Sequence, residues 1–170
     1  MVKANAVKVM DDKCVLLDTN FCVRLLKQSD PFHDNVLGFY RHFLEKEYRL
    51  KISTISVAEY CVKGAVDQLP LKNVEVLPFN LNHAVKAGEF ANLVFAKKGA
   101  LELGDRLIIP NDTKLFAQAH VEREITTFAT SDEQSIKIYE FLQKSQSLDF
   151  EIINIQQPYN SVLGILPLEN

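Results

Sequence analysis

The sequence predicts an α/β protein, a three-layer α/β/α sandwich in which helices cover both faces of a short, mainly parallel sheet. Two observations predict it. Short apolar runs typical of buried strands alternate with longer segments of helical periodicity, and a helical segment follows each of the first four runs. Such alternation builds βαβ units. We expect one domain over 1–170, with a core of about 14–155, an N-terminal extension 1–13 and an irregular C-terminal tail 156–170.

The apolar runs place five strands, at 14–18, 51–55, 74–79, 125–129 and 150–155. The clearest helix has an apolar stripe at i, i+3, i+4, i+7 and i+8, formed by Val36, Phe39, Tyr40, Phe43 and Leu44. Pro78 should end the third strand.

Other helices begin near Asn20 and extend over 81–98, 112–123 and 133–143. In the helix over 81–98 the expected stripe is Leu81, Ala84, Val85, Gly88 and Phe95. Ser56 is expected to cap a helix reaching about Gln68, and Glu59, three residues later, completes a capping box. Two glycines and a proline predict a loop over 99–111.

Composition limits the classes of protein that the chain can belong to. With 47% hydrophobic and 24% charged residues it is globular rather than disordered, and its net charge of −3 disfavours a protein that coats nucleic acid. No segment has the roughly 20 apolar residues of a membrane span, so we expect a cytoplasmic protein. Cys14, Cys22 and Cys61 lie in apolar stretches and are expected to be buried, without a disulfide or zinc site.

Four acids follow or begin elements of the predicted sheet: Asp18, Glu59, Asp112 and Asp132. Ligands of open parallel sheets bind outside the carboxyl ends of the strands, so the four should lie at one edge. Each acid alone is explained as well by helix capping, because a carboxylate at a helix start is stabilised by roughly 0.3–1 kcal/mol. Position therefore makes a metal site plausible, and the local sequence must decide.

The sequence around these acids resembles the PIN-domain nucleases. The resemblance rests on VLLDTN (15–20), SVAEY (56–60), NDTKLFAQAH (111–120) and TSD (130–132), and covers about 14–155. It implies a Rossmann-like sandwich and cleavage of RNA with Mg²⁺ or Mn²⁺. The catalytic and metal-binding residues would be Asp18, Glu59, Asp112 and Asp132. Thr19, Asn20 and Thr130 would support these acids.

The resemblance also implies partners. An RNA substrate is expected, and the size and composition fit the toxin of a toxin–antitoxin pair, as in VapC-like proteins, with a small antitoxin partner and a homodimer. The same sequence also fits a housekeeping RNA-processing enzyme or a stand-alone nuclease. Residues that could contact RNA flank the acids: Lys63, Lys97, Lys98, Arg106 and Lys114, with Lys63, Arg106 and Lys114 preferred. His120, two turns beyond Asp112, is expected to pack or lie on the surface rather than catalyse.

Three other functions put acids at similar positions or share the fold. A haloacid-dehalogenase-type phosphotransferase needs a second Asp two residues after the first, where Asn20 stands. A phospho-receiver domain needs acids from separate strand ends, and Asp11 and Asp12 lie too close to Asp18. The main alternative is a PIN-like domain that binds or scaffolds without catalysis, although it would have no reason to keep four mutually repelling acids.

Overall fold

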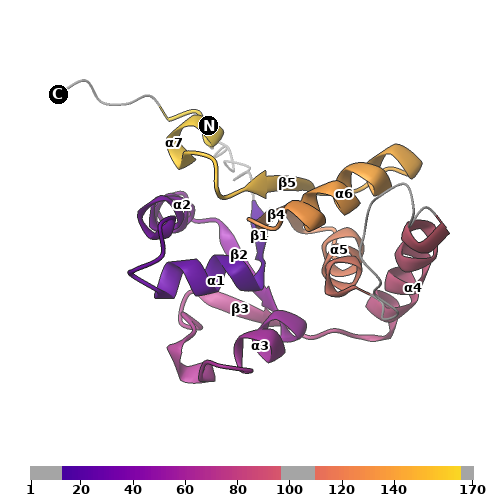
Figure 1. Ribbon diagram of the computed structural model, residues 1–170, viewed down its shortest axis with the longest axis horizontal. Helices are drawn as coiled ribbons and strands as arrows, with labels where there is room; N and C mark the ends of the chain where they lie inside the picture. Colours follow the sequence, from indigo (N-terminus) through magenta and orange to yellow (C-terminus); the bar gives the residue numbers. More distant parts are fainter. Residues whose placement is uncertain (1–12, 97–109, 166–170) are drawn as a thin grey trace, which may run out of the picture.

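The computed structural model describes residues 13–96 and 110–165, and within them a five-stranded sheet forms the centre (Figure 1). The strand order is β3-β2-β1-β4-β5, and every pairing is parallel. The strands are β1 (Cys14–Leu17), β2 (Arg49–Ser53), β3 (Val74–Leu77), β4 (Ile125–Thr130) and β5 (Glu151–Asn154). The predicted sheet is thus confirmed, and the second strand lies two residues earlier than expected.

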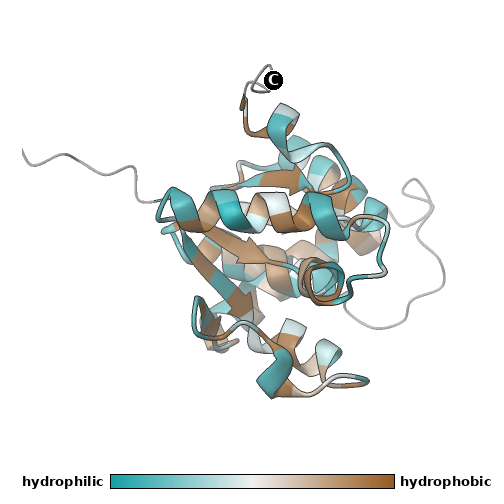
Figure 2. Cartoon of the chain, turned by 90° about the vertical axis from the view of Figure 1, so that its left-hand side faces the viewer, coloured by the Kyte–Doolittle hydropathy of each residue, from teal (hydrophilic) through white to brown (hydrophobic). Residues whose placement is uncertain are grey.

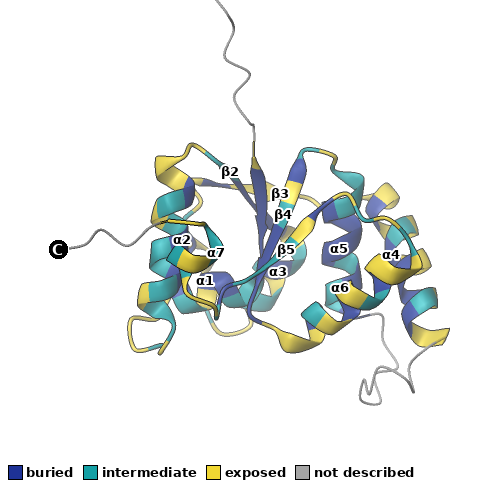
Figure 3. Cartoon of the chain, turned by 90° about the horizontal axis from the view of Figure 1, so that it is seen from above, coloured by how far each residue is buried: buried dark blue, intermediate teal, exposed yellow. Residues whose placement is uncertain are grey.

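Helices cover both faces of the sheet, as Figure 3 shows from above. One layer contains α1 (Thr19–Leu26), α2 (His33–Glu45) and α7 (Tyr159–Val162), and the other α4 (Leu81–Ala96), α5 (Asn111–Val121) and α6 (Glu133–Ser145). The short α3 (Thr54–Tyr60) and the 3₁₀ helix η1 (Val66–Gln68) connect β2 to β3. The predicted α/β/α sandwich is confirmed. No helix in the described ranges is long and apolar enough to cross a membrane.

Strand β1 lies between two hydrophobic cores and contributes residues to both. All four of its residues are completely buried. Val15 and Leu17 face the core under α1 and α2, whereas Cys14 and Leu16 face the core under α4, α5 and α6. Coloured by hydropathy, the strands are largely hydrophobic while the outer helices alternate (Figure 2). Burial on both faces explains why this strand has no polar alternation in the sequence.

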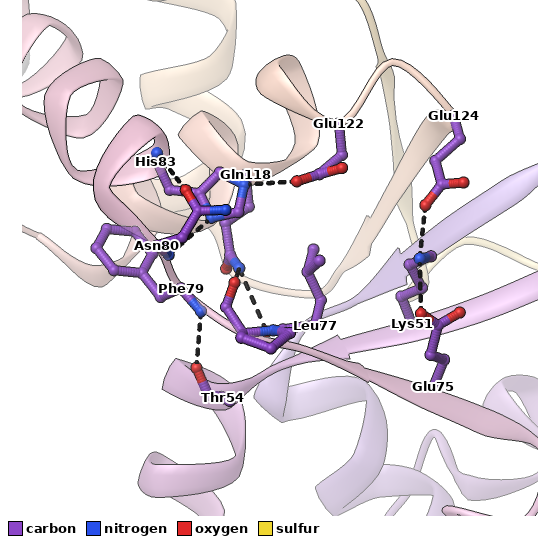
Figure 4. Close-up of polar contacts among 11 residues, drawn as sticks. Lys51, Thr54, Glu75, Leu77, Phe79, Asn80, His83, Gln118, Glu122 and Glu124 are labelled. Carbon is purple, nitrogen blue, oxygen red and sulfur yellow. Dashed lines mark hydrogen bonds and ion pairs between the residues drawn. The ribbon is translucent and has the colours of Figure 1, made fainter.

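The buried amine of Lys51 in β2 is an exception to the apolar interior. Its Nζ lies 3.1 Å from a carboxylate oxygen of Glu75 and 2.5 Å from one of Glu124 (Figure 4). These two carboxylates raise the pKa of Lys51, against the opposing effect of burial. A buried charge must be paired, and the Glu75 and Glu124 carboxylates pair with the Lys51 ammonium. This cluster therefore has a structural role.

The region after β2 differs from the prediction. Ser53, not Ser56, caps the helix, accepting a hydrogen bond from the Ile55 amide at 3.0 Å. Ser56 is buried inside α3, which ends at Tyr60 instead of near Gln68. The predicted capping box was therefore wrong. The strand's last residue already supplies a side-chain oxygen, so the helix starts earlier and the Glu59 carboxylate is free for other contacts.

Helix α4 shows the opposite face to the one predicted. The buried residues are His83, Ala87, Phe90, Ala91 and Val94. Leu81 and Val85 are 77% and 58% exposed, so the predicted stripe faces outward. Periodicity does not indicate which face of α4 is buried, because this helix carries apolar residues on two faces. The small Ala87 and Ala91 lie on the buried face.

The start of α4 is fixed by His83 (Figure 4). Its Nδ1 accepts a hydrogen bond from the Asn80 amide at 3.0 Å, and the His83 amide donates to Asn80 Oδ1 at 3.1 Å. Nε2 therefore carries the ring proton and donates to Glu122 at 2.8 Å. All polar atoms of this buried ring are satisfied, so the residue has a capping role.

The C-terminal tail was expected to be irregular, but it contains α7, which packs on α2. The contact is close, because a Cβ at Gly38 of α2 would lie 2.4 Å from the Tyr159 ring of α7.

The cysteines differ from one another in burial. Cys61 is exposed, contrary to prediction, while Cys14 and Cys22 are buried, and all three are free thiols. Most of the predicted loop over 99–111 lies outside the described residues; its last residue, Asn111, begins α5.

Candidate active site

The four predicted acids lie at the carboxyl edge of the sheet, where strands end and helices begin. Asp18 follows β1 and caps α1, and Asp132 follows β4 and caps α6. Asp112 lies in the first turn of α5, and Glu59 near the end of the short α3. Because the strands are parallel, these starts share one edge.

Asp18 is the most buried of the four acids, with 6% of its surface exposed. Its Oδ1 accepts a hydrogen bond from the Thr19 amide at 2.7 Å, which is a helix cap. Its Oδ2 accepts from the Thr130 hydroxyl at 2.6 Å and from the Asn20 amide group. Asp18 is therefore a helix cap, which was the other explanation for this acid, and it is also the centre of a polar cluster joining β1 to β4.

Glu59 does not serve as a cap. Its carboxylate accepts hydrogen bonds from the Thr19 hydroxyl on one oxygen and from the Asn111 side-chain amide on the other. These donors lie 40 and 52 residues away in the sequence, so Glu59 links α3 to α1 and to α5. Sequence reasoning missed Asn111; its position next to Asp112 at a helix start was the available indication.

Ser135 joins the other two acids. Its hydroxyl donates to Asp112 Oδ1, and its backbone amide donates to Asp132 Oδ1 at 3.4 Å. Asp132 Oδ1 also accepts from the Gln134 amide at 2.7 Å, so it too caps a helix. Sequence reasoning missed Ser135, which is fully buried and lies one turn after Asp132.

Electrostatics couple three of the acids. Burial, chiefly, raises the pKa of Asp18 to about 7, and the negative charges of Asp112 and Glu59 raise it further. Hydrogen bonds from Thr130 and from the Thr19 backbone oppose this rise but do not cancel it. Repulsion of this kind requires carboxylates close to one another. Glu59 and Asp112 therefore both lie close enough to Asp18 to act on its charge.

The donor set suits a hard divalent cation in its chemistry. It consists of carboxylate oxygens from separate segments, which Mg²⁺ and Mn²⁺ accept, and no thiolate or imidazole. A cation there would also offset the repulsion on Asp18. As the side chains lie, no three His, Cys, Asp or Glu residues within 13–96 and 110–165 converge closely enough to enclose one ion. Hydrogen bonds hold the Glu59 carboxylate to Thr19 and Asn111.

Of the five basic residues expected near the acids, two are described. Lys114 donates to Asn111 Oδ1 at 3.1 Å, one side chain away from Glu59. Lys63 is exposed and lines a groove that Glu59 also lines. Lys97, Lys98 and Arg106 lie outside the described residues. His120 packs against Phe90, with ring centroids 5.7 Å apart, as the packing expectation for this residue predicted.

This protein is a parallel α/β sandwich with an acidic cluster at the carboxyl edge of its sheet. Sequence comparison identifies the family to which it belongs. The PIN domain family model matches residues 15–142, most of the chain. The chain belongs to the PIN domain family. A search of curated protein sequences gives no match.

Solved structures that share the fold of this chain include the three that follow. The chain resembles one in VapBC2 from Rickettsia felis bound to a promoter DNA fragment, at 20% identity and a TM-score of 0.58, covering 82% of this chain and 97% of that one. It also resembles a chain of FitAcB from Neisseria gonorrhoeae, at 18% identity and a TM-score of 0.56, and the match covers 84% of this chain and 99% of that one. A third similar structure is VapBC-1 from nontypeable Haemophilus influenzae, at 21% identity and a TM-score of 0.56, and the match covers 85% of this chain and 99% of that one. At these identities the likeness concerns the fold.

The raised pKa of Asp18 predicts an unusual pH dependence of stability. Between its ordinary value of 3.8 and about 7, the folded protein keeps the Asp18 proton while the unfolded chain has lost it. The free energy of unfolding should therefore fall as pH rises through this window, by at most about 1.4 kcal/mol per pH unit. Asp18→Asn should remove this slope.

The measurement is urea unfolding of both proteins in chelator between pH 4 and 8. Asp18→Asn also alters a helix cap, so the test is the pH dependence of the difference, not its size at one pH. Asp67→Asn, at an exposed acid, is the control and should run parallel to the unmodified protein. Parallel curves for Asp18→Asn as well would contradict the assigned pKa.

Proposed function

We propose that this protein is a divalent-metal-dependent endoribonuclease that hydrolyses RNA phosphodiester bonds, with Mg²⁺ or Mn²⁺ as cofactor. The observation that carries the proposal is the position of Asp18, Glu59 and Asp112 at the carboxyl edge, where Asp18 is buried and the charges of the other two acids add to the rise in its pKa. Helix capping alone does not require such a cluster. The family assignment supports the same conclusion.

In this proposal each acid has a role. Asp18 is the central ligand because it is the most buried of the four acids and the charges of both Asp112 and Glu59 act on it. Glu59 and Asp112 complete the main site, and Asp132 holds a second ion or orients the attacking water. Thr19, Asn20 and Thr130 orient the carboxylates by donating hydrogen bonds to them. The metal, when bound, activates the water and neutralises the phosphate charge.

Two lysines are proposed to hold the anionic backbone. Lys114 is placed by Asn111 beside the acids, and Lys63 is exposed on the groove next to Glu59. Amines at such positions attract phosphates in a protein that is acidic overall. The alternative function is a PIN-like binding or scaffold module without activity, which retains the fold but needs no metal.

The decisive experiment is incubation with mixed-sequence single-stranded RNA in Mn²⁺, Mg²⁺ or EDTA. We expect cleavage only with metal, and a loss of at least about 100-fold in Asp18→Asn and Asp112→Asn, because each removes a charged ligand oxygen. The same metals should raise the melting temperature, and Asp112→Asn should stabilise the metal-free protein by relieving repulsion. Cleavage retained by Asp18→Asn would overturn the assignment. Neither cleavage nor a metal effect on melting would favour the inert module.

We further propose that the protein is the toxin of a VapC-like pair, acting in the cytoplasm and silenced by a small antitoxin. Support comes from the solved VapBC complexes that share its fold. Induced expression should arrest bacterial growth, and Asp18→Asn at equal protein level should not, because arrest requires RNA cleavage. Unimpaired growth with active enzyme would favour a housekeeping ribonuclease.

A homodimer is proposed to form through the outer face of α4. This face carries Leu81, Ala84, Val85, Gly88 and Phe95, an apolar stripe on a soluble protein. A contiguous exposed stripe of this kind is typical of an interface. Val85→Glu should therefore give a monomer in sedimentation velocity, since it buries a charge in the contact. Val66→Glu, at a similarly exposed valine on η1, serves as control. An unchanged dimer in Val85→Glu would place the interface elsewhere.

A further inference from the structure

Beside the acidic cluster lies a groove between α1 and the end of α3. Its volume is about 740 Å³, within the range of sites that enclose small organic ligands. Thr19 and Glu59, whose side chains bond to each other, line one end of it. The groove is therefore continuous with the proposed catalytic centre.

The lining combines apolar surface with amines. Its apolar part is formed by Val23, Leu26, Val62 and the ring of Tyr60, and its amines belong to Lys27 and Lys63. Val62 is 77% exposed and belongs to neither hydrophobic core. Among the lining residues Glu59 is the only acid, so the groove away from that end is locally basic on an acidic protein.

The Tyr60 ring has a defined position in this groove. Its hydroxyl donates to Gln68 Oε1 at 3.1 Å, which links the end of α3 to η1. A Cβ on Gly64 would lie 2.4 Å from a ring carbon, so Gly64 packs directly against the ring. An aromatic ring fixed by these two contacts is a suitable stacking surface for a nucleobase, since stacking does not depend on base identity.

We propose that this groove binds the unstacked nucleotide of single-stranded RNA next to the scissile phosphate. The base lies on Tyr60, Val23 and Val62, and Lys27 and Lys63 contact the flanking phosphates. Single-stranded RNA offers a flat apolar base and an anionic backbone, the two chemistries that this lining complements. The inference rests on the proposed ribonuclease function. An apolar peptide would use the same walls, but the two amines beside the carboxylates favour the polyanion.

The test measures RNA binding separately from cleavage. Anisotropy of a labelled single-stranded 12-mer in EDTA reports binding by the full chain without hydrolysis. Lys27→Gln and Lys63→Gln should each weaken binding roughly threefold to tenfold, and each should lower the salt slope by about 1. Val62→Asp should weaken it similarly, whereas Val66→Asp, at an exposed valine that does not line the groove, should bind normally. Lys144→Gln, in the opposite helical layer, is the control for loss of one positive charge.

A crosslink locates the base. RNA carrying 5-iodouridine should crosslink on irradiation to the peptide containing Tyr60, and the crosslink should be lost in Tyr60→Leu, with folding checked by circular dichroism. Normal RNA binding by all groove variants, or a crosslink only elsewhere, overturns the proposal and leaves the groove to an apolar peptide. Metal-dependent cleavage in that case would still uphold the nuclease. Groove-dependent binding without cleavage would uphold the groove and contradict the nuclease.

Discussion

The burial of β1 on both faces dictates how the helical layers are arranged around the sheet. All four of its side chains are inaccessible, and each face contacts a separate core. A strand covered on both sides needs a helical layer on each, and its parallel neighbours need helical crossovers to return the chain. Every helix that follows a strand then starts at the same edge. The gathering of acids there follows from the same topology that forms the cores.

That edge combines structural and chemical roles in the same atoms. Asp18 and Asp132 each cap a helix and also belong to the polar cluster, so helix capping and a catalytic role do not exclude each other. Glu59 separates the two interpretations, because its carboxylate contacts Thr19 and Asn111 rather than its own helix. Burying Asp18 near two other charges costs stability in the neutral range, which a protein tolerates when function requires it.

Apolar surface outside the cores includes, within the described residues, the outer stripe of α4 and the groove beside α3. The exposed positions of the α4 stripe are uncharged apart from the flanking Glu89, whereas the groove beside α3 is bordered by amines. We therefore propose different partners for the two surfaces, a second protein for the α4 stripe and a nucleotide for the groove. In this proposal, assembly and substrate binding use separate surfaces.

The sheet, the sandwich and the edge at which the acids lie could be predicted from local stretches of residues, because two-sided burial and parallel pairing leave their pattern there. The serine that caps α3 and the buried face of α4 could not be predicted, since Ser53 and Ser56 are both competent caps and α4 is apolar on two sides. These features, and the contacts of Asn111 and Ser135, became known from the folded chain alone. A hydrogen bond or a packing contact between distant segments depends on their relative position in space, which neither periodicity nor spacing encodes.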